Sequence, residues 1–260
     1  MKFVESLNTA LDKLLSEQEN IFLYGEDLTD PYGGTFKVSK GLSTKYPVNV
    51  ISTPISEAML VGMSGGMAIG GLRPIVEIMF GDFLTLASDQ LLNHITKYAW
   101  MYNGKVTTPV TIRTAMGGRR GYGPTHSQSL EPFLASIPLL KIISPSNYHN
   151  PGELLEQCVL KDDDIKIFSE HKLLYPKELR TNNNCPDGIN VEYSNSMYPT
   201  AFLSNCQFEK PDLIIISHGG NSIMIEELMV DFLMEYELSI EAILPSLISP
   251  LPYNDIIKKI

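Results

Sequence analysis

Short apolar segments alternate with helical segments along residues 1–175, and this alternation limits the folds open to the chain. Strands that alternate with helices form βαβ units, in which neighbouring strands run parallel. The expected strands span 21–24, 48–52, 73–80, 109–113, 141–144 and 165–169, and the main expected helices span 2–17, 83–100 and 151–160. We therefore predict an α/β fold with a mainly parallel sheet.

Composition divides the chain into three parts. Residues 1–175 carry the regular alternation, whereas residues 176–210 contain the turn-forming stretch RTNNNCPDG and show no clear period. We predict that 176–210 is a linker. A strand at 213–217, a helix at 221–236 and a strand at 240–244 follow. These few elements are a small basis for an independent core, so we expect 211–260 to be an incomplete second α/β domain.

The charge balance and the cysteines exclude several classes of protein. Thirty acidic and 20 basic side chains give a formal net charge of −10, which disfavours nucleic acid as a partner. No apolar run approaches the roughly 18 residues of a membrane-spanning helix. Cys158, Cys185 and Cys206 are too scattered for a disulfide framework or a zinc site. We expect no metal site in the chain, no membrane partner, and a reducing, cytoplasmic compartment.

One predicted helix carries three glycines at four-residue spacing. It follows Pro54, which fits the first turn of a helix, and it places Glu57 near the positive end of the helix dipole. Gly62, Gly66 and Gly70 then share one face. Glycine in a helix interior costs about 1 kcal/mol relative to alanine, so this face is expected to admit another helix closely. The spacing leaves open whether that helix belongs to the same chain or to a partner subunit.

Side chains that could carry chemistry follow several predicted strands. Glu26 follows the first strand, Glu57 begins the glycine-bearing helix, Phe83 follows the third strand, and His126 lies in a glycine-rich loop. Ligand sites of α/β proteins lie at the carboxyl ends of their strands. A buried glutamate or a loop histidine can transfer protons near neutral pH, but each is also common as a structural or solvated residue. P-loop, HExxH, CxxC and GxSxG sequences are absent, so the mechanisms that they carry have no support.

Four segments in order resemble one enzyme family. They read GEDLTDPYGGTFKVSKGLSTKY, TPISEAMLVGMSGGMAIGGLRPIVEIMFGDF, ASDQLLNHITKYAWMYNG and GPTHSQSLEPFLASIPLLKIISPSN. Together they are similar to the β subunit of thiamine-diphosphate-dependent 2-oxoacid dehydrogenases, the first component of the pyruvate, branched-chain and acetoin dehydrogenase complexes. The resemblance is dense over 1–175 and looser over 211–260. It implies a transketolase-like pyrimidine-binding domain over 1–175 and a partial C-terminal domain over 211–260.

The resemblance also implies a cofactor and a partner. In this family an α subunit pairs with the β subunit in an α₂β₂ tetramer and holds the diphosphate and Mg²⁺ through a GDG motif, which this chain lacks. The β subunit receives the aminopyrimidine ring of thiamine diphosphate. The tetramer decarboxylates a 2-oxoacid and transfers the acyl group to lipoamide on an acyltransferase core.

Four residues acquire roles through the resemblance. Glu57 matches the glutamate of the PISE motif, which hydrogen-bonds the aminopyrimidine ring and promotes loss of the thiazolium proton. Phe83 matches an aromatic residue that packs against that ring. His126 matches the histidine of the HSQ motif, which lines the substrate channel and assists acyl transfer. Glu26 matches an acidic residue of the GED segment that contributes to a buried acidic path between active sites.

Two departures from the family pattern leave alternatives open. Some relatives bind potassium near the turn that reads CVLKDDD here, where Lys161 stands in place of an aspartate and would repel the cation. The family's second domain also continues beyond the region that matches LISPLPYNDIIKKI, so this chain resembles a C-terminally shortened member. The alternatives are another transketolase-like acyl or acyloin transfer without a lipoyl core, and a non-catalytic paralogue that binds an α subunit.

Overall fold

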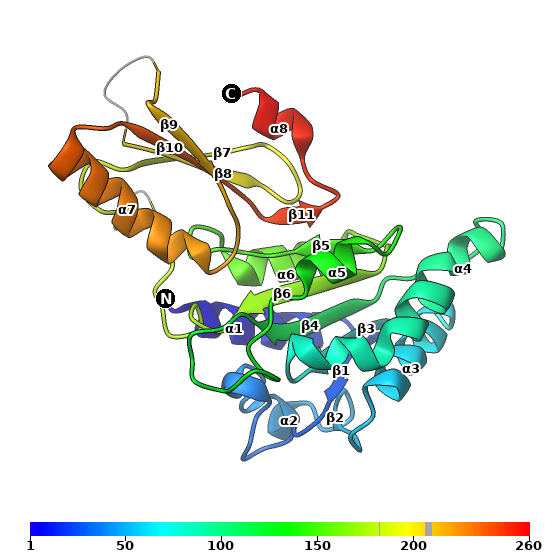
Figure 1. The fold of residues 1–260 in the computed structure, drawn as a ribbon. Helices are drawn as coiled ribbons and strands as arrows, with labels where there is room; N and C mark the ends of the chain where they lie inside the picture. Colours follow the sequence, from blue (N-terminus) through cyan, green and yellow to red (C-terminus); the bar gives the residue numbers. More distant parts are fainter. Residues whose placement is uncertain (182, 206–209) are drawn as a thin grey trace.

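The computed structural model describes residues 1–181, 183–205 and 210–260, so Cys206 lies outside the described residues. Two sheets with helices on their faces make up this part of the chain (Figure 1). The helices are α1 (Phe3–Glu17), α2 (Leu42–Lys45), α3 (Glu57–Ile69), α4 (Thr96–Met101), α5 (Glu131–Ala135), α6 (Pro151–Leu160), α7 (Asn221–Tyr236) and α8 (Tyr253–Ile257). The strands are β1 (Ile21–Gly25), β2 (Val50–Ser52), β3 (Arg73–Ile78), β4 (Thr111–Met116), β5 (Lys141–Ile143), β6 (Lys166–His171), β7 (Asn190–Tyr193), β8 (Thr200–Ser204), β9 (Leu213–Ile216), β10 (Ile240–Pro245) and β11 (Leu247–Ser249).

The first sheet is parallel except at one edge. Its strands lie in the order β11-β5-β6-β4-β3-β1-β2, and only β11 runs antiparallel to its neighbour. The parallel pairs arise because a helical or loop segment crosses over between consecutive strands. The predicted α/β fold with a mainly parallel sheet is therefore confirmed.

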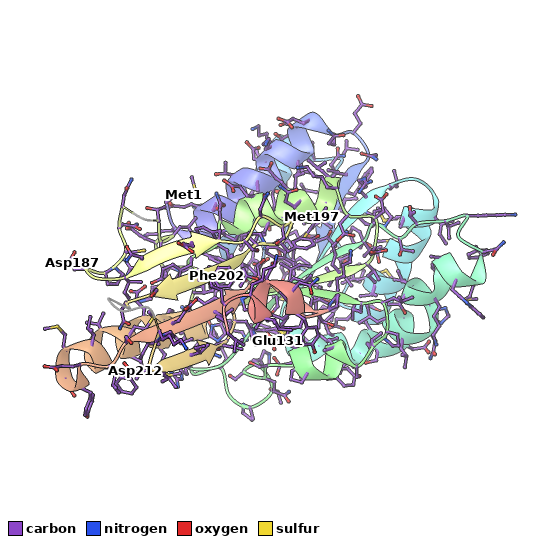
Figure 2. All side chains as sticks on the ribbon, turned by 90° about the horizontal axis from the view of Figure 1, so that it is seen from above. Met1, Glu131, Asp187, Met197, Phe202 and Asp212 are labelled. Carbon is purple, nitrogen blue, oxygen red and sulfur yellow. The ribbon has the colours of Figure 1, made fainter. Side chains whose placement is uncertain are left out.

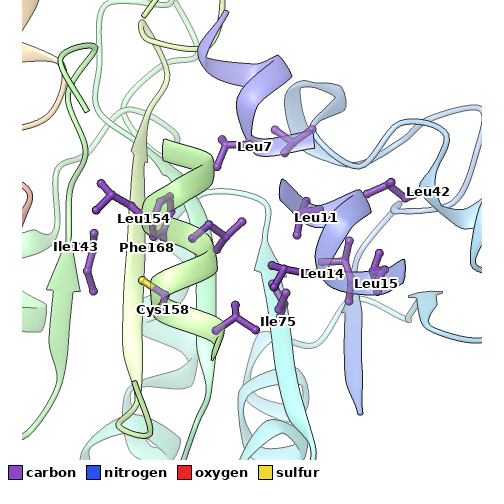
Figure 3. Packing of buried hydrophobic residues seen from close by; sticks show 14 of the residues in the cluster. Leu7, Leu11, Leu14, Leu15, Leu42, Ile75, Ile143, Leu154, Cys158 and Phe168 are labelled. Carbon is purple, nitrogen blue, oxygen red and sulfur yellow. The ribbon is translucent and has the colours of Figure 1, made fainter. Parts of the chain in front are cut away.

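Helices α1 and α6 cover one face of this sheet. Leu7, Leu11 and Leu14 recur at helical spacing on α1 and pack with Leu154 of α6 and Phe168 of β6 in one buried cluster (Figure 3). The two helices can approach closely because α6 carries a glycine in its first turn. A Cβ atom at Gly152 would lie 2.5 Å from the backbone oxygen of Ser6. This contact orients the start of α6 against α1.

The opposite face is covered by α3 and by the segment predicted as one helix over 83–100. That segment is helical but divided into a 3₁₀ helix (Gly81–Ala87), a π-helical turn (Gln90–Ile95) and α4. Its buried residues Leu84, Leu91 and Ile95 pack with Leu60 of α3 and Val76 of β3. The apolar spacing predicted the buried side correctly, although it did not reveal the changes in helical pitch.

The structure of α3 differs from our predictions in two respects, the position of Pro54 and the glycine at which another helix approaches. The helix begins at Glu57 with Ser56 as its N-cap, so Pro54 precedes the helix instead of opening it. Within the chain, the tight approach to α3 uses Gly65, where a Cβ atom would lie 2.8 Å from Ile95. A Cβ atom at Gly66 would meet nothing within 4 Å. The face of α3 that carries Gly66 is thus not occupied by another described element of this chain.

A second, four-stranded sheet follows the first unit. Its order is β7-β8-β10-β9, with β8 antiparallel to β7 and β10, and β9 parallel to β10. Helix α7 covers one face through Ile225 and Met229. Strands β7 and β8 lie inside the range 176–210 that we predicted as a linker, so this range holds part of the second sheet. Seen from above, this unit occupies one end of the molecule, where Asp187 and Asp212 lie (Figure 2).

None of the helices in the described ranges combines the length and the apolar character that a membrane crossing requires.

Candidate functional site

The predicted site residues lie at one edge of the first sheet. Glu26 directly follows β1, Glu57 begins the helix after β2, Phe83 lies in the 3₁₀ helix after β3, and His126 lies in the loop after β4. Strands β2, β1, β3 and β4 are neighbours in that order and run parallel. Their carboxyl ends therefore meet at the same edge, which is where open α/β sheets bind ligands.

Glu26 and Glu57 form a pair of buried carboxyl groups. Their exposed fractions are only 3 % and 6 %. Burial raises the pKa of Glu26, and the negative charge of Glu57 raises it further. The backbone N–H of Ser56 donates to the Glu26 carboxyl group, but Oε1 of Glu26 has no hydrogen-bond partner among the described residues. Glu26 therefore has an unused acceptor in a buried position.

Phe83 and His126 form a second pair at the same carboxyl edge of the first sheet. The ring centroids of Phe83 and His126 lie 5.2 Å apart in an edge-to-face arrangement, and Phe80 approaches the same imidazole at 4.8 Å. Thr125 Oγ1 lies 2.9 Å from Nδ1 of His126. The imidazole is thus held between two aromatic rings and remains half-buried. Among the described residues, no hydrogen bond or ring contact joins this pair to Glu26 or Glu57.

A buried ion network joins three strands of the first sheet, and we did not predict it from the sequence. Arg113 of β4 donates from Nε and Nη2 to the two oxygens of Glu170 at 2.8 and 2.9 Å, and from Nη1 to Glu77 at 2.9 Å. Tyr175 also donates to Glu170, and the backbone N–H of Thr35 donates to Glu77. A signal was present in the sequence, because each of the three charged residues lies within a strand that the alternation of segments predicts to be buried.

The network reaches the site through stacked aromatic rings. Phe36 stacks on Tyr175 with ring centroids 4.7 Å apart, and its edge approaches Phe80 at 6.4 Å. Lys172, at the end of β6, lies 5.1 Å above the Phe80 ring and donates to the carbonyl oxygen of Gly117 at 2.9 Å. These contacts fix Phe80, which in turn packs against His126.

The turn at which the sequence resemblance implied a potassium site is already held by side-chain cations. Arg73 Nη1 donates to the carbonyl oxygen of Val159 at 2.7 Å, and Lys166 Nζ donates to the carbonyl oxygen of Asp162 at 2.6 Å. Lys166 is fully buried, whereas Lys161 is exposed. The residues present do not fit a monovalent metal ion, although the obstacle is Arg73 and Lys166 and not Lys161. The described residues also contain no cluster of metal-ligating side chains.

Comparison with known proteins identifies the domain. Residues 1–178 match the family described as "Transketolase, pyrimidine binding domain". The chain belongs to this family. The resemblance inferred from the sequence blocks is thereby confirmed, and the matched residues contain all four predicted site residues.

Named relatives match mainly over the same region. The chain is 34 % identical to the acetoin:2,6-dichlorophenolindophenol oxidoreductase subunit beta of Cupriavidus necator, over 82 % of this chain and 62 % of that protein. It is 38 % identical to pyruvate dehydrogenase E1 component subunit beta-1 of Oryza sativa, over 66 % of this chain and 46 % of that protein. It is 36 % identical to the 2-oxoisovalerate dehydrogenase subunit beta of Pseudomonas aeruginosa, over 67 % of this chain and 50 % of that protein. The matches thus span roughly half of each relative's length.

A solved structure shares the fold over the whole chain. It is described as a split gene transketolase, inactive beta4 tetramer, and superposes with a TM-score of 0.70 at 15 % identity. The superposition covers 100 % of this chain and 75 % of that one. At this identity it supports the transketolase-like fold alone, including the second sheet.

Proposed function

We propose that the chain acts as the β-type subunit of a thiamine-diphosphate-dependent 2-oxoacid dehydrogenase, together with an α subunit. The observation that carries this proposal is the buried pair Glu26 and Glu57, in which Oε1 of Glu26 has no hydrogen-bond donor among the described residues. An unsatisfied buried acceptor costs about 1–3 kcal/mol, and more if it is charged. The pair therefore favours a ligand that brings N–H groups, and the aminopyrimidine ring of thiamine diphosphate has that chemistry.

Each predicted residue has a task in this proposal. When bound, thiamine diphosphate supplies a nucleophilic carbon and an electron sink for the loss of carbon dioxide from a 2-oxoacid. Glu57 accepts a hydrogen bond from the ring and stabilises a proton on the ring nitrogen. Burial and the negative charge of Glu57 raise the pKa of Glu26, which favours proton sharing between the two carboxyl groups. Phe83 offers an apolar surface for the ring, and His126 transfers a proton during acyl transfer to lipoamide.

The α subunit is proposed to cover the open face of α3. Gly66 has no neighbour within 4 Å of its Cβ position, and Ile55, Met59, Met63 and Ile69 are exposed around the same helix. Apolar patches of this kind mark interaction surfaces. A partner helix could approach Gly66 closely, while its subunit provides the diphosphate and Mg²⁺ site through a GDG motif. Docking of the assembled tetramer to a lipoyl acyltransferase core belongs to the same proposal.

Native mass spectrometry of the protein purified from its own cells tests the assembly. We expect a heteromer with a larger subunit and two thiamine diphosphates, which decarboxylates a 2-oxoacid and reductively acylates a lipoyl domain. Glu57→Gln should assemble normally but lose nearly all turnover, because the amide cannot accept the ring proton. Glu19→Gln, an exposed glutamate on the same chain, is the matched control and should keep full activity.

Other results would support different functions. Decarboxylation without lipoyl acylation would indicate acyl or acyloin transfer without a lipoyl core. A heteromer that binds no cofactor would indicate a non-catalytic paralogue. Full turnover in Glu57→Gln would refute the assigned mechanism.

A further inference from the structure

The loop that carries His126 needs an anchor. It spans residues 117–130 between β4 and α5, and Gly117, Arg119, Gly121 and Gly123 adopt positive φ angles within it. Fixing the backbone of each residue costs about 1–2 kcal/mol in conformational entropy. A loop of this length holds a side chain in one place only if specific contacts offset that cost.

We propose that Asp82 and Gln128 form a clasp that positions His126 against Phe80 and Phe83. The clasp itself is independent of the reaction, whereas its catalytic consequence rests on the proposed function. Asp82 and Gln128 are positioning residues, because neither is expected to contact the reacting atoms.

The geometry of the clasp is specific. Oδ1 of Asp82 accepts hydrogen bonds from Nε2 of Gln128 at 2.9 Å and from its backbone N–H at 3.3 Å. Asp82 is only 6 % exposed and immediately precedes Phe83, and Gln128 follows His126 by two residues. One carboxylate therefore joins the segment that carries both phenyl rings to the segment that carries the imidazole.

Further contacts close the loop on its other side. The backbone N–H of Gly117 donates to the carbonyl oxygen of Gln128 at 3.1 Å, so the two ends of the loop meet at the clasp. Lys172 binds the Gly117 carbonyl oxygen and also lies over the Phe80 ring. The two segments are thus held together both through Asp82 and through Lys172. This arrangement explains how a half-buried imidazole in a glycine-rich loop stays between two phenyl rings.

Histidine ring NMR on the full chain tests the clasp without cofactor or partner. The edge-to-face contacts with Phe80 and Phe83 should shift the ring protons of His126, and a His126→Asn variant assigns them. In Gln128→Ala we expect these signals to lose most of that shift and to sharpen, because the ring leaves its fixed position. Gln128 is exposed, so this variant should keep the thermal midpoint of the wild type. Ser129→Ala, the exposed neighbour, is the control and should leave the signals unchanged.

A second variant guards against a purely local effect of the alanine. Gln128→Glu places a carboxylate against Asp82, and like charges at this distance repel, so it should displace His126 as well. In the proposed holoenzyme, Gln128→Ala should slow acyl transfer by up to roughly 100-fold and decarboxylation much less, because small misplacements of a catalytic group are costly. Unchanged His126 signals in both variants would overturn the clasp. Displaced signals with unchanged acyl transfer would support the clasp and refute the role of His126.

Discussion

Replacement of Arg113 by methionine is the most informative perturbation of the structure, because it removes the only cation of the buried network beneath the site. Arg113, Glu77 and Glu170 are each at most 3 % exposed. Burial alone would lower the pKa of Arg113, but the two carboxylates raise it, so the guanidinium stays charged. Methionine is similar in length but leaves both carboxyl groups without their main donor.

The size of the effect follows from the burial of those carboxyl groups. Removing one partner of a buried ion pair costs about 3–5 kcal/mol. Protonation limits the loss, because neutralising a carboxyl with an ordinary pKa near 4.5 costs roughly 3 kcal/mol at neutral pH. We therefore expect Arg113→Met to lose about 3–5 kcal/mol of unfolding free energy, which corresponds to about 6–20 °C in Tm.

The loss should depend on pH with a definite sign. Arg113 is the main group that lowers the pKa of Glu77, so without it burial raises this folded-state pKa further above its unfolded value. The folded state then binds more protons than the unfolded state between about pH 5 and pH 8, so stability falls as pH rises through this window. The difference in unfolding free energy between wild type and variant should therefore increase as the pH rises.

Urea unfolding at several pH values, followed by circular dichroism, measures this. Lys13→Met breaks an exposed ion pair with Glu156 and serves as the control, with little expected change. Adding Glu77→Gln and Glu170→Gln to Arg113→Met should remove the pH dependence. A loss below about 1 kcal/mol, or a loss that is the same at all pH values, would refute the electrostatic account and leave only altered packing.

Three further predictions concern groups elsewhere in the chain. Glu57→Gln should lower the pKa of Glu26 toward its usual value, measured by carboxyl carbon-13 NMR, because the charge of Glu57 is one of the causes of its elevation, after burial. Burial lowers the pKa of His149 to about 4, so the unfolded state binds a proton at a higher pH than the folded state does. The free energy of unfolding should therefore fall by up to roughly 3 kcal/mol as the pH drops from about 6.5 to 4. In urea unfolding, His149→Leu should lack this loss. Because Arg73 and Lys166 already bind the carbonyl oxygens of the 158–164 turn, Tm should be equal in potassium, sodium and choline chloride.

Each of these predictions has a matched comparison. Glu19→Gln should leave the titration of Glu26 unchanged, and an unchanged pKa in Glu57→Gln would mean that the two carboxyl groups do not interact. His94 is exposed, so His94→Gln should retain the acid sensitivity of the wild type. A potassium-specific rise in Tm would show that the turn admits a metal ion despite the two side-chain cations.

Strand β1 could be predicted from sequence because it is buried almost throughout and therefore reads as a continuous apolar run. Strand β7 escaped prediction for the opposite reason. Only Val191 of its four residues is buried, and it pairs at the edge of the second sheet, so its sequence resembles a loop. Strand β11 consists of three residues and depends on pairing with β5, which lies about 100 positions earlier in the chain. The residues next to β11 in the sequence therefore do not indicate that it pairs with β5.

The residues of the site could be predicted from the sequence, but which of them contact one another could not. The carboxyl-edge rule selected Glu26, Glu57 and Phe83, because each follows a strand directly or opens the next helix. Which of them meet depends on the strand order, in which β1 lies between β2 and β3. The same rule also pointed to His126, but it could not reveal how the imidazole is held, because the contact between Gln128 and Asp82 joins positions 46 residues apart.

The buried acidic groups of this domain fall into two kinds, and the difference separates structural from functional roles. All four carboxyl oxygens of Glu77 and Glu170 accept hydrogen bonds from the protein itself. Oε1 of Glu26 and Oδ2 of Asp82, which are buried to a similar degree at the edge of the same sheet, accept none. Burial alone would penalise both kinds equally, so the fold has satisfied the two acids within strands β3 and β6 and left acceptors open at the carboxyl edge of the sheet. Open acceptors that face water-poor surroundings favour a ligand that donates hydrogen bonds, and the edge is therefore organised for such a ligand before it binds.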